Sequence, residues 1–387
     1  SAVQGIAFGV MLRAGLADIE GAYRYSQVSL HLLDRLNDRF YKTLTVVAYE
    51  SCIRHWKEPL RPSLPVLLNT YHEGLELGNQ EFASLSASVY CIHQLFLGES
   101  LPTVAQAFQE YRTQILRFNQ EAIAYQMQPW HQLALNLQGE ATDPGGLIGT
   151  ALNEDEMLPV FIANQLGIPR FYTYIAREMW LYHAGDYARS LEAARLAKPL
   201  EESAPATPGY AYRYFYESLA CLALYPTASQ ANRRKYWRWV RGNQRQAKHW
   251  AKSCPENYQY RYDLVEAERF RVRGRFAEAI AHYDRAIEQA KAQEYIHEVA
   301  LANELTARFF LSLGKDKLAQ PYLLEARHSY LRWGATFKVE QLDALYPQLR
   351  NRSSEVVSSD LKTSRSRSTS RTSSRSLVQV LDLDTVT

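Results

Sequence analysis

The chain has 387 residues, 47% of them hydrophobic, which is enough for two or three ordinary domains or one extended solenoid. Its formal net charge of +3 is too small to indicate a polyanionic partner by itself, and no apolar run of about eighteen residues predicts a membrane span. The four cysteines, Cys52, Cys91, Cys221 and Cys254, have neither CxxC nor zinc-site spacing, so we expect free thiols and a reducing, cytoplasmic setting.

Helical periodicity runs along nearly the whole chain. Apolar residues recur three and four positions apart, in segments separated by Gly, Pro or Asn, and strand-like alternation is nearly absent. The pattern is already present at Ser1, from which we expect a piece of a longer protein. The predicted helices are 2–14, 21–36, 40–57, 64–77, 80–97, 102–118, 121–138, 169–184, 187–198, 209–224, 229–251, 257–273, 276–291, 294–313, 316–333 and 336–345.

Residues 139–168 interrupt this pattern with Gly, Pro and the acidic run Asn153–Glu156, and we expect a long excursion between repeats. The acidic run could ligate a divalent cation, but it lacks the alternating oxygens and the glycine of a calcium loop. A solvated loop, or a helix start with acidic residues in its first turn, is the stronger interpretation.

A turn template recurs along the chain, in which a glycine is followed by small residues at offsets of five and twelve. One copy near the start has alanine in the glycine position, and a weaker copy begins at Gly98, with Thr103 and Glu110 at the later offsets. The full copies are Gly274, Ala279 and Ala286; Gly314, Ala319 and Ala326; Gly185, Ser190 and Ala197; and Ala17, Ala22 and Ser29.

This template is typical of a helix–turn–helix unit, which cannot bury its own apolar face and must stack on copies of itself. We therefore predict an all-α fold over residues 1–350: a tetratricopeptide-like α-solenoid of irregular repeats. Residues 351–376 are Ser and Thr punctuated by Arg365, Arg367, Arg371 and Arg375, a composition that predicts a disordered linker. Residues 377–387 return to an apolar pattern and are interpreted as the truncated start of a further domain.

Motifs of known chemistry are missing from the sequence. There is no GxxxxGK[ST], no kinase HRD or DFG, no HExxH and no GxSxG. His55 and His93 have no acidic partner at a fixed offset, so both are interpreted as interior or boundary side chains rather than general bases. We accordingly predict no catalytic, cofactor-binding or metal-ligating residue in this chain.

The strongest basic patch lies in residues 231–252, where Arg, Lys and Trp alternate as in proteins that bind single-stranded nucleic acid. Helical projection weakens that interpretation, because Trp237, Val240, Gln244, Ala247 and Ala251 share one face. The cations expected on the solvated face are Arg233, Arg234, Arg241, Arg245 and Lys248.

Several blocks of the chain resemble the central region of large multidomain bacterial, chiefly cyanobacterial, signalling kinases. The blocks are IRHWKE at 53–58, YFYESLACLALYP at 214–226, LVEAERFRVRG at 264–274, ALANELTARF at 300–309 and RWGATFKVEQL at 332–342. In that family a serine/threonine-kinase-like domain and an AAA-type ATPase module precede such helical repeats. A Ser-rich linker, GAF and histidine-kinase domains follow them.

The resemblance implies a non-catalytic sensory and coupling segment that contacts protein partners or neighbouring domains of the same polypeptide. It places ATP and Mg²⁺ only in the flanking domains, with the 377–387 segment leading into a GAF domain. A free-standing interaction scaffold is the main alternative, and a nucleic-acid-binding repeat protein is a weaker one.

Overall fold

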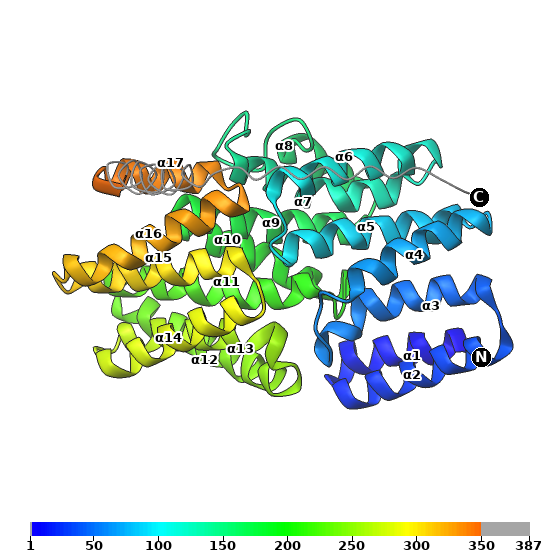
Figure 1. Ribbon diagram of the computed structural model, residues 1–387, viewed down its shortest axis with the longest axis horizontal. Coiled ribbons are helices and arrows are strands. Elements are labelled where there is room, and N and C mark those ends of the chain that lie inside the picture. The colour runs from blue at the N-terminus through cyan, green and yellow to red at the C-terminus, as the bar shows by residue number, and fades with distance from the viewer. Residues whose placement is uncertain (1, 350–387) are drawn as a thin grey trace, which may run out of the picture. The chain divides into compact units, whose positions relative to one another are not determined.

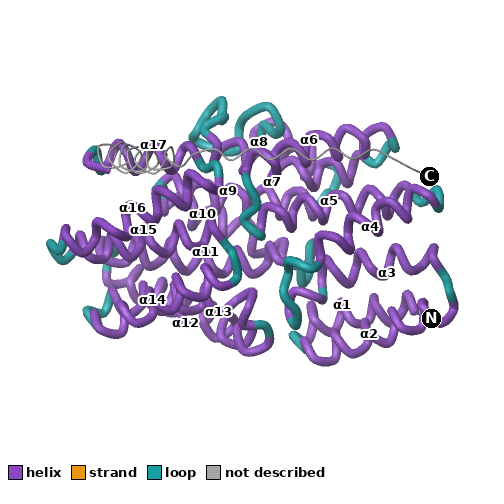
Figure 2. Tube along the Cα trace, in the orientation of Figure 1, coloured by secondary structure: helices purple, strands orange, loops and turns teal. Residues whose placement is uncertain are grey.

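The computed structural model describes residues 2–349, where helices follow one another without a strand (Figures 1 and 2). Residues 2–340 belong to one unit, and a second begins at Gln341. The expected linker 351–376 and the domain start 377–387 lie outside the described residues. The described helices are α1 Ala2–Leu16, α2 Ile19–Leu36, α3 Arg39–Cys52, α4 Ser63–Glu76, α5 Gln80–Phe96, α6 Leu101–Arg117, α7 Glu121–Gln138, α8 Glu154–Ala163, α9 Gly167–Ala184, α10 Tyr187–Ala197, α11 Pro208–Leu224, α12 Gln230–Ser253, α13 Pro255–Arg271, α14 Phe276–Ala292, α15 Ile296–Ser312, α16 Asp316–Trp333 and α17 Thr336–Leu345, with short 3₁₀ turns η1 Arg54–Trp56, η2 Lys198–Ser203 and η3 Tyr225–Thr227.

The first unit is a stack of helix hairpins in two layers, which confirms the predicted all-α solenoid. Neighbouring helices in the chain pack as pairs, and α5, α7, α9, α11 and α13 also pack each against the next to form an inner layer. Burial separates the layers: thirteen of the 17 residues of inner helix α15 are buried, against five of the 17 in outer helix α14. The core therefore lies along the inner helices, as stacked hairpins require.

The turn template has the conformation expected of it. Gly274, Gly314 and Gly185 have φ values of +70°, +65° and +92°, and Ala17, in the glycine position of the first copy, has φ +55°. A residue with positive φ just after a helix turns the chain back, so that the next backbone N–H groups donate to the last carbonyls of the helix. The helix therefore ends at this residue. The small residues that follow lie at the helix crossings, and all of them are at most 2% exposed: Ala22, Ser29, Ser190, Ala197, Ala279, Ala286, Ala319 and Ala326.

The copy that begins at Gly98 is shifted by one residue. Gly98 has φ +74°, but Thr103 and Glu110 are exposed, and the fully buried position is Val104. The cause is the connection, because two residues separate Gly98 from α6, whereas one residue follows the glycine before α10, α14 and α16. The longer turn moves the crossing from the fifth residue to the sixth.

Substitution of Gly274 tests the turn. A Cβ at this position would meet nothing within 4 Å, so the requirement is the positive φ rather than a close helix approach. Gly274→Val should lower the free energy of unfolding by more than about 1 kcal/mol, because a β-branched residue disfavours the left-handed region. Gly274→Asn is the matched control and should stay close to wild type in urea denaturation, since Asn tolerates that conformation. Equal midpoints for wild type and Gly274→Val would contradict the turn assignment.

The segment 139–168 is only partly the excursion expected from the sequence, because its second part forms α8. Asn153 caps this helix by accepting a hydrogen bond from the amide of Asp155, and three acidic residues occupy its first turn. Negative charge at the N-terminus favours a helix, which agrees with the second interpretation of the acidic run.

Polar side chains of α7 form hydrogen bonds with the backbone of the loop before α8. Gln132 accepts hydrogen bonds from the amides of Ala151 and Leu152 at 3.0 and 3.1 Å. Asn136 donates to the carbonyl of Gly146 at 2.8 Å. These buried partners replace the backbone hydrogen bonds that a loop cannot make with itself.

Candidate functional site

The two halves of the chain meet at a clamp centred on Asn257, at the start of α13. Its side-chain amide donates to the carbonyls of His55 and Glu58 at 2.7 and 2.8 Å. Its oxygen accepts from the amide of Leu60 at 3.1 Å and from the hydroxyl of Tyr295 at 3.0 Å. One buried side chain thus satisfies four groups and joins segments about two hundred residues apart in sequence.

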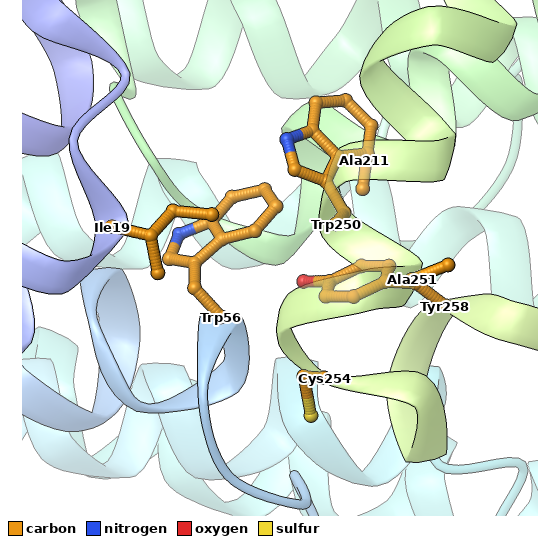
Figure 3. Close-up of a cluster of buried hydrophobic side chains, with 7 residues drawn as sticks. All are labelled: Ile19, Trp56, Ala211, Trp250, Ala251, Cys254 and Tyr258. Carbon is orange, nitrogen blue, oxygen red and sulfur yellow. The ribbon is translucent and has the colours of Figure 1, made fainter.

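An aromatic cluster surrounds this clamp (Figure 3). The blue turn that carries Trp56 faces the green helices that carry Trp250 and Tyr258, and the Trp56 and Tyr258 rings stack with centroids 5.2 Å apart. The guanidinium of Arg13 lies 3.8 Å from the Trp56 ring centroid, and Arg13 is 5% exposed. A buried cation on an aromatic face fixes α1 to this junction.

A second junction contains charged side chains inside the inner layer. Glu304 of α15 accepts from Lys338 Nζ at 3.0 Å, from the Tyr330 hydroxyl at 2.6 Å and from Arg308 at 2.5 Å. Lys338 also donates to the carbonyl of His183 in α9 at 3.2 Å. Burial alone would raise the pKa of Glu304, but Arg308 and Lys338 outweigh it and lower the pKa to about 2. This carboxylate therefore stays ionised and holds α9, α15, α16 and α17 together.

A third junction joins α5, α11, α13 and α15. Arg261 donates to Glu298 at 3.1 Å, and its guanidinium lies 3.8 Å from the centroid of the Tyr212 ring. The Tyr212 hydroxyl donates to the carbonyl of Phe96 at 3.1 Å. The interior of the solenoid is thus filled by the side chains of the inner helices themselves.

The structure places both sequence-selected histidines in the interior. His55 Nε2 lies 2.8 Å from the carbonyl oxygen of Ala206, and His93 Nδ1 lies 2.8 Å from the Ser63 hydroxyl. Burial lowers the pKa of His93 to about 3 and holds that of His55 well below its usual value. Both are interior side chains, as predicted, and neither is placed to exchange protons with a substrate in solvent.

The cysteines follow the same pattern. Cys91, Cys221 and Cys254 are fully buried, Cys52 is partly buried, and all four are free. Burial raises the pKa of the Cys91 and Cys221 thiols, which makes them small apolar side chains rather than nucleophiles.

The candidate site open to solvent is a groove of about 530 Å³ between the α5–α6 turn and helices α14, α15 and α16. Its floor depends on a close contact: a Cβ at Gly98 would lie 2.3 Å from Nδ1 of His297. Three ion pairs lie at its rim: Arg61 with Glu99 at 2.8 Å and with Glu294 at 3.6 Å, and Lys291 with Glu325 at 3.5 Å. The remaining charged lining residue is Arg332.

This groove is suited to binding rather than to a reaction. Its cations and carboxylates are equal in number, and they are half-exposed and partly paired with each other. Such groups can exchange their partners for those of a bound peptide or domain at little cost in desolvation. The turn that forms its floor was recognised from the sequence, but the pairing of residues near 61 and 99 with residues 291–332 was not.

The basic face of α12 is as the helical projection predicted. Arg233, Arg234, Arg241, Arg245 and Lys248 are exposed, while Val240, Gln244 and Ala251 are buried. The Trp237 ring is contacted by cations of the same chain, since Arg273 and Arg269 lie 4.4 and 5.0 Å from its centroid. A ring that already stacks with cations of its own chain is less available for stacking with a base.

The blocks that carry the family resemblance coincide with the junctions. The 53–58 block supplies Trp56 and two of the carbonyls bound by Asn257, and the 300–309 and 332–342 blocks supply Glu304 and Lys338. These residues make contacts between hairpins.

Comparison with known proteins gives one partial relationship. A stretch of 64 residues, 16% of this chain, is 41% identical to the hybrid signal transduction histidine kinase G of Dictyostelium discoideum, of which it covers 2%. No protein-family model and no solved structure matches the chain. A short part of this helical chain is therefore weakly similar to a signalling histidine kinase.

No helix in residues 2–349 is long and apolar enough to cross a membrane. In the same range no three His, Cys, Asp or Glu side chains are grouped so that they could hold a metal ion.

Proposed function

We propose that this chain is the non-catalytic sensory and coupling segment of a multi-sensor signalling kinase. In this role it links an upstream ATPase or kinase module to downstream GAF and histidine-kinase domains. The observation that carries the proposal is the set of buried junctions, because Asn257 and Glu304 tie hairpins far apart in sequence into one unit. A displacement at one junction must be accommodated at the others, which is what a coupling element requires. The partial similarity to a hybrid signal transduction histidine kinase supports the same role.

The charged groove is the proposed input surface. It lies between the α5–α6 turn and the end of α14, which the superhelical path brings together. A protein partner or neighbouring domain could replace one member of the Arg61–Glu99 pair and one member of the Lys291–Glu325 pair. It would then bind both sides of the groove and could shift them relative to each other. The partner surface that fits this groove would carry both positive and negative side chains.

The experiment uses the full polypeptide encoded by the natural reading frame. The double variant Lys291→Glu, Arg332→Glu reverses two cations of the groove and should change the incorporation of labelled phosphate at the downstream histidine. Lys248→Glu, Arg245→Glu is the matched control on the exposed face of α12 and should leave phosphorylation unchanged. Equal phosphorylation for all three proteins would contradict the coupling role, and a natural stop codon after Thr387 would favour the free-standing scaffold.

The isolated chain should not turn over ATP. Its sequence lacks the phosphate-cradling Gly-Lys motif and the kinase motifs that hold Mg²⁺ and the γ-phosphate. Incubated with Mg·ATP, the purified chain should release no phosphate above the buffer blank and incorporate no label, while an active kinase in the same buffer does both. Stoichiometric turnover that coelutes with the chain through two chromatographic steps would overturn the non-catalytic assignment.

The exposed cations of α12, among them Arg241, Arg245 and Lys248, favour nucleic acid as a second candidate partner. Binding that rests on such cations falls steeply with salt, so retention on single-stranded RNA at low salt, lost in the Lys248→Glu, Arg245→Glu variant, would support it. The cation contacts of the Trp237 ring argue against it.

A further inference from the structure

A second cavity, of about 170 Å³, opens between α9, α11, α13 and α15, beside the start of α10. It is smaller than the pockets of about 300–1,000 Å³ that hold drug-sized ligands, so its volume suits a small molecule. It shares no lining residue with the charged groove. We call it the inner cavity, and the polar residues of its lining are Tyr182, Tyr187, Glu268, Arg271 and Arg308.

Tyr182 of α9 is a polar side chain of the inner cavity that the fold itself does not explain. It is 4% exposed, and its hydroxyl makes no hydrogen bond with any described residue. Buried hydroxyls normally have a partner, because their desolvation without a hydrogen bond is unfavourable. Burial also raises the pKa of this phenol well above its usual value, so the group stays protonated and can donate. A ligand that accepts a hydrogen bond in the cavity would supply the missing partner.

The two arginines of the lining keep unused donors beside their ion pairs. Arg271 donates to Glu268 through Nε at 2.9 Å and through Nη2 at 2.6 Å. Arg308 donates to Glu304 through Nη2 at 2.5 Å and to the Tyr187 hydroxyl through Nη1. Because a guanidinium carries five N–H groups, these pairs do not exhaust it. Nη1 of Arg271 and Nε of Arg308 make no hydrogen bond within the described part of the chain, and neither atom is enclosed by protein.

The acceptors around the inner cavity, in contrast, are already occupied. Oε1 of Glu268 accepts from the Tyr283 hydroxyl, and Oε2 accepts from Arg271. Both oxygens of Glu304 are occupied at the junction described above. The Tyr187 hydroxyl accepts from an arginine, and its own proton is donated to no described residue. The unused groups of this cavity are therefore donors, and a ligand that fits them must supply acceptors.

We propose that the inner cavity binds a small molecule through its carboxylate or phosphate group, which lies between Arg271, Arg308 and the Tyr182 hydroxyl. Such an oxyanion accepts several hydrogen bonds at once, and guanidinium donors bind it more strongly than neutral donors do. The ligand contacts α9, α13 and α15 together, which are helices of three different hairpins. Because the charged groove takes no part in this site, failure of the site would leave the proposed coupling function standing.

Equilibrium dialysis of the full chain against labelled inorganic phosphate, and separately against labelled acetate, measures this binding. Sodium chloride holds the ionic strength constant, so that weak attraction to exposed cations is the same in every sample. The wild-type chain should bind at least one of the two anions saturably, with one anion per chain. The probe that binds more tightly shows whether the ligand presents a phosphate or a carboxylate. A chain that binds neither anion saturably would overturn the proposal.

Tyr182→Phe places the binding in the inner cavity. It removes a hydroxyl that has no partner in the free protein, so the urea midpoint should stay at the wild-type value. The dissociation constant of the anion should rise about tenfold or more, because one hydrogen bond to a charged group is lost. Tyr174→Phe is the matched control, since Tyr174 is a buried residue of the same helix outside the cavity, and it should bind as wild type does. Arg308→Lys keeps the charge opposite Glu304 but loses the planar donors, and it should also weaken binding. An anion affinity that Tyr182→Phe leaves unchanged would overturn the proposal.

Discussion

Glu304→Gln is expected to destabilise the fold by about 3–5 kcal/mol, the cost of removing one partner of a buried ion pair. Glutamine keeps the size and an acceptor oxygen but removes the charge opposite Lys338, whose side chain is 2% exposed. Lys338 cannot reach water without displacing α17 from α9 and α15. The loss should appear as a lower urea midpoint with an unchanged slope, because the change affects stability and leaves the surface exposed on unfolding the same.

Two matched variants show that the loss comes from the buried charge. Glu278→Gln breaks the exposed pair with Arg275 and should leave the midpoint unchanged. Adding Lys338→Met to a Glu304→Met variant removes the uncompensated cation and should recover most of the stability, since apolar replacements of buried pairs are often near neutral. A Glu304→Gln midpoint equal to that of Glu278→Gln would contradict the assigned junction.

Glu304 also makes the free energy of unfolding depend on pH. The folded pKa of Glu304 is lowered to about 2, below the value near 4.3 of a free glutamate. The unfolded chain therefore takes up a proton first as the pH falls, and the stabilisation is complete above about pH 5 and is lost progressively towards pH 2. Glu304→Gln should lose less stability across this window than wild type, measured by urea midpoints at each pH.

Ala279→Trp is expected to lower the free energy of unfolding by at least about 3 kcal/mol. Ala279 is 0% exposed and occupies the crossing position five residues after Gly274. The indole has no space there, so α14 must move away from its neighbours, and overfilled cores lose stability through such shifts. Thermal or urea denaturation measures the loss, together with a larger exposed apolar surface in the native state.

Ala281→Trp is its control on the same helix, because Ala281 is exposed and the added ring can lie in solvent. It should change the free energy of unfolding by less than about 0.5 kcal/mol. If both variants denature at the same midpoint, the small residues of the template do not mark helix crossings.

Much of the fold could be predicted from the sequence because its signals are local. Apolar spacing fixes where helices run, and the positive φ after a helix selects glycine, or Ala17 in the first copy. Two places show where local signals are incomplete. The crossing after Gly98 lies one residue later than in the template because its connection is longer, and α8 was expected only as one of two interpretations of the acidic run Asn153–Glu156.

The candidate sites, in contrast, were decided by the tertiary structure. Asn257 beside residues 55–60, Glu304 beside Lys338, and the groove between residues 61–99 and 291–332 all follow from the path of the superhelix. That path is the sum of small rotations between successive hairpins, and no local pattern specifies the sum. By itself, the sequence determined most of the helices and, in the four full copies of the template, which small residues are buried after each turn. Only the tertiary structure decided which distant hairpins share a buried charge, because that depends on the path of the whole superhelix.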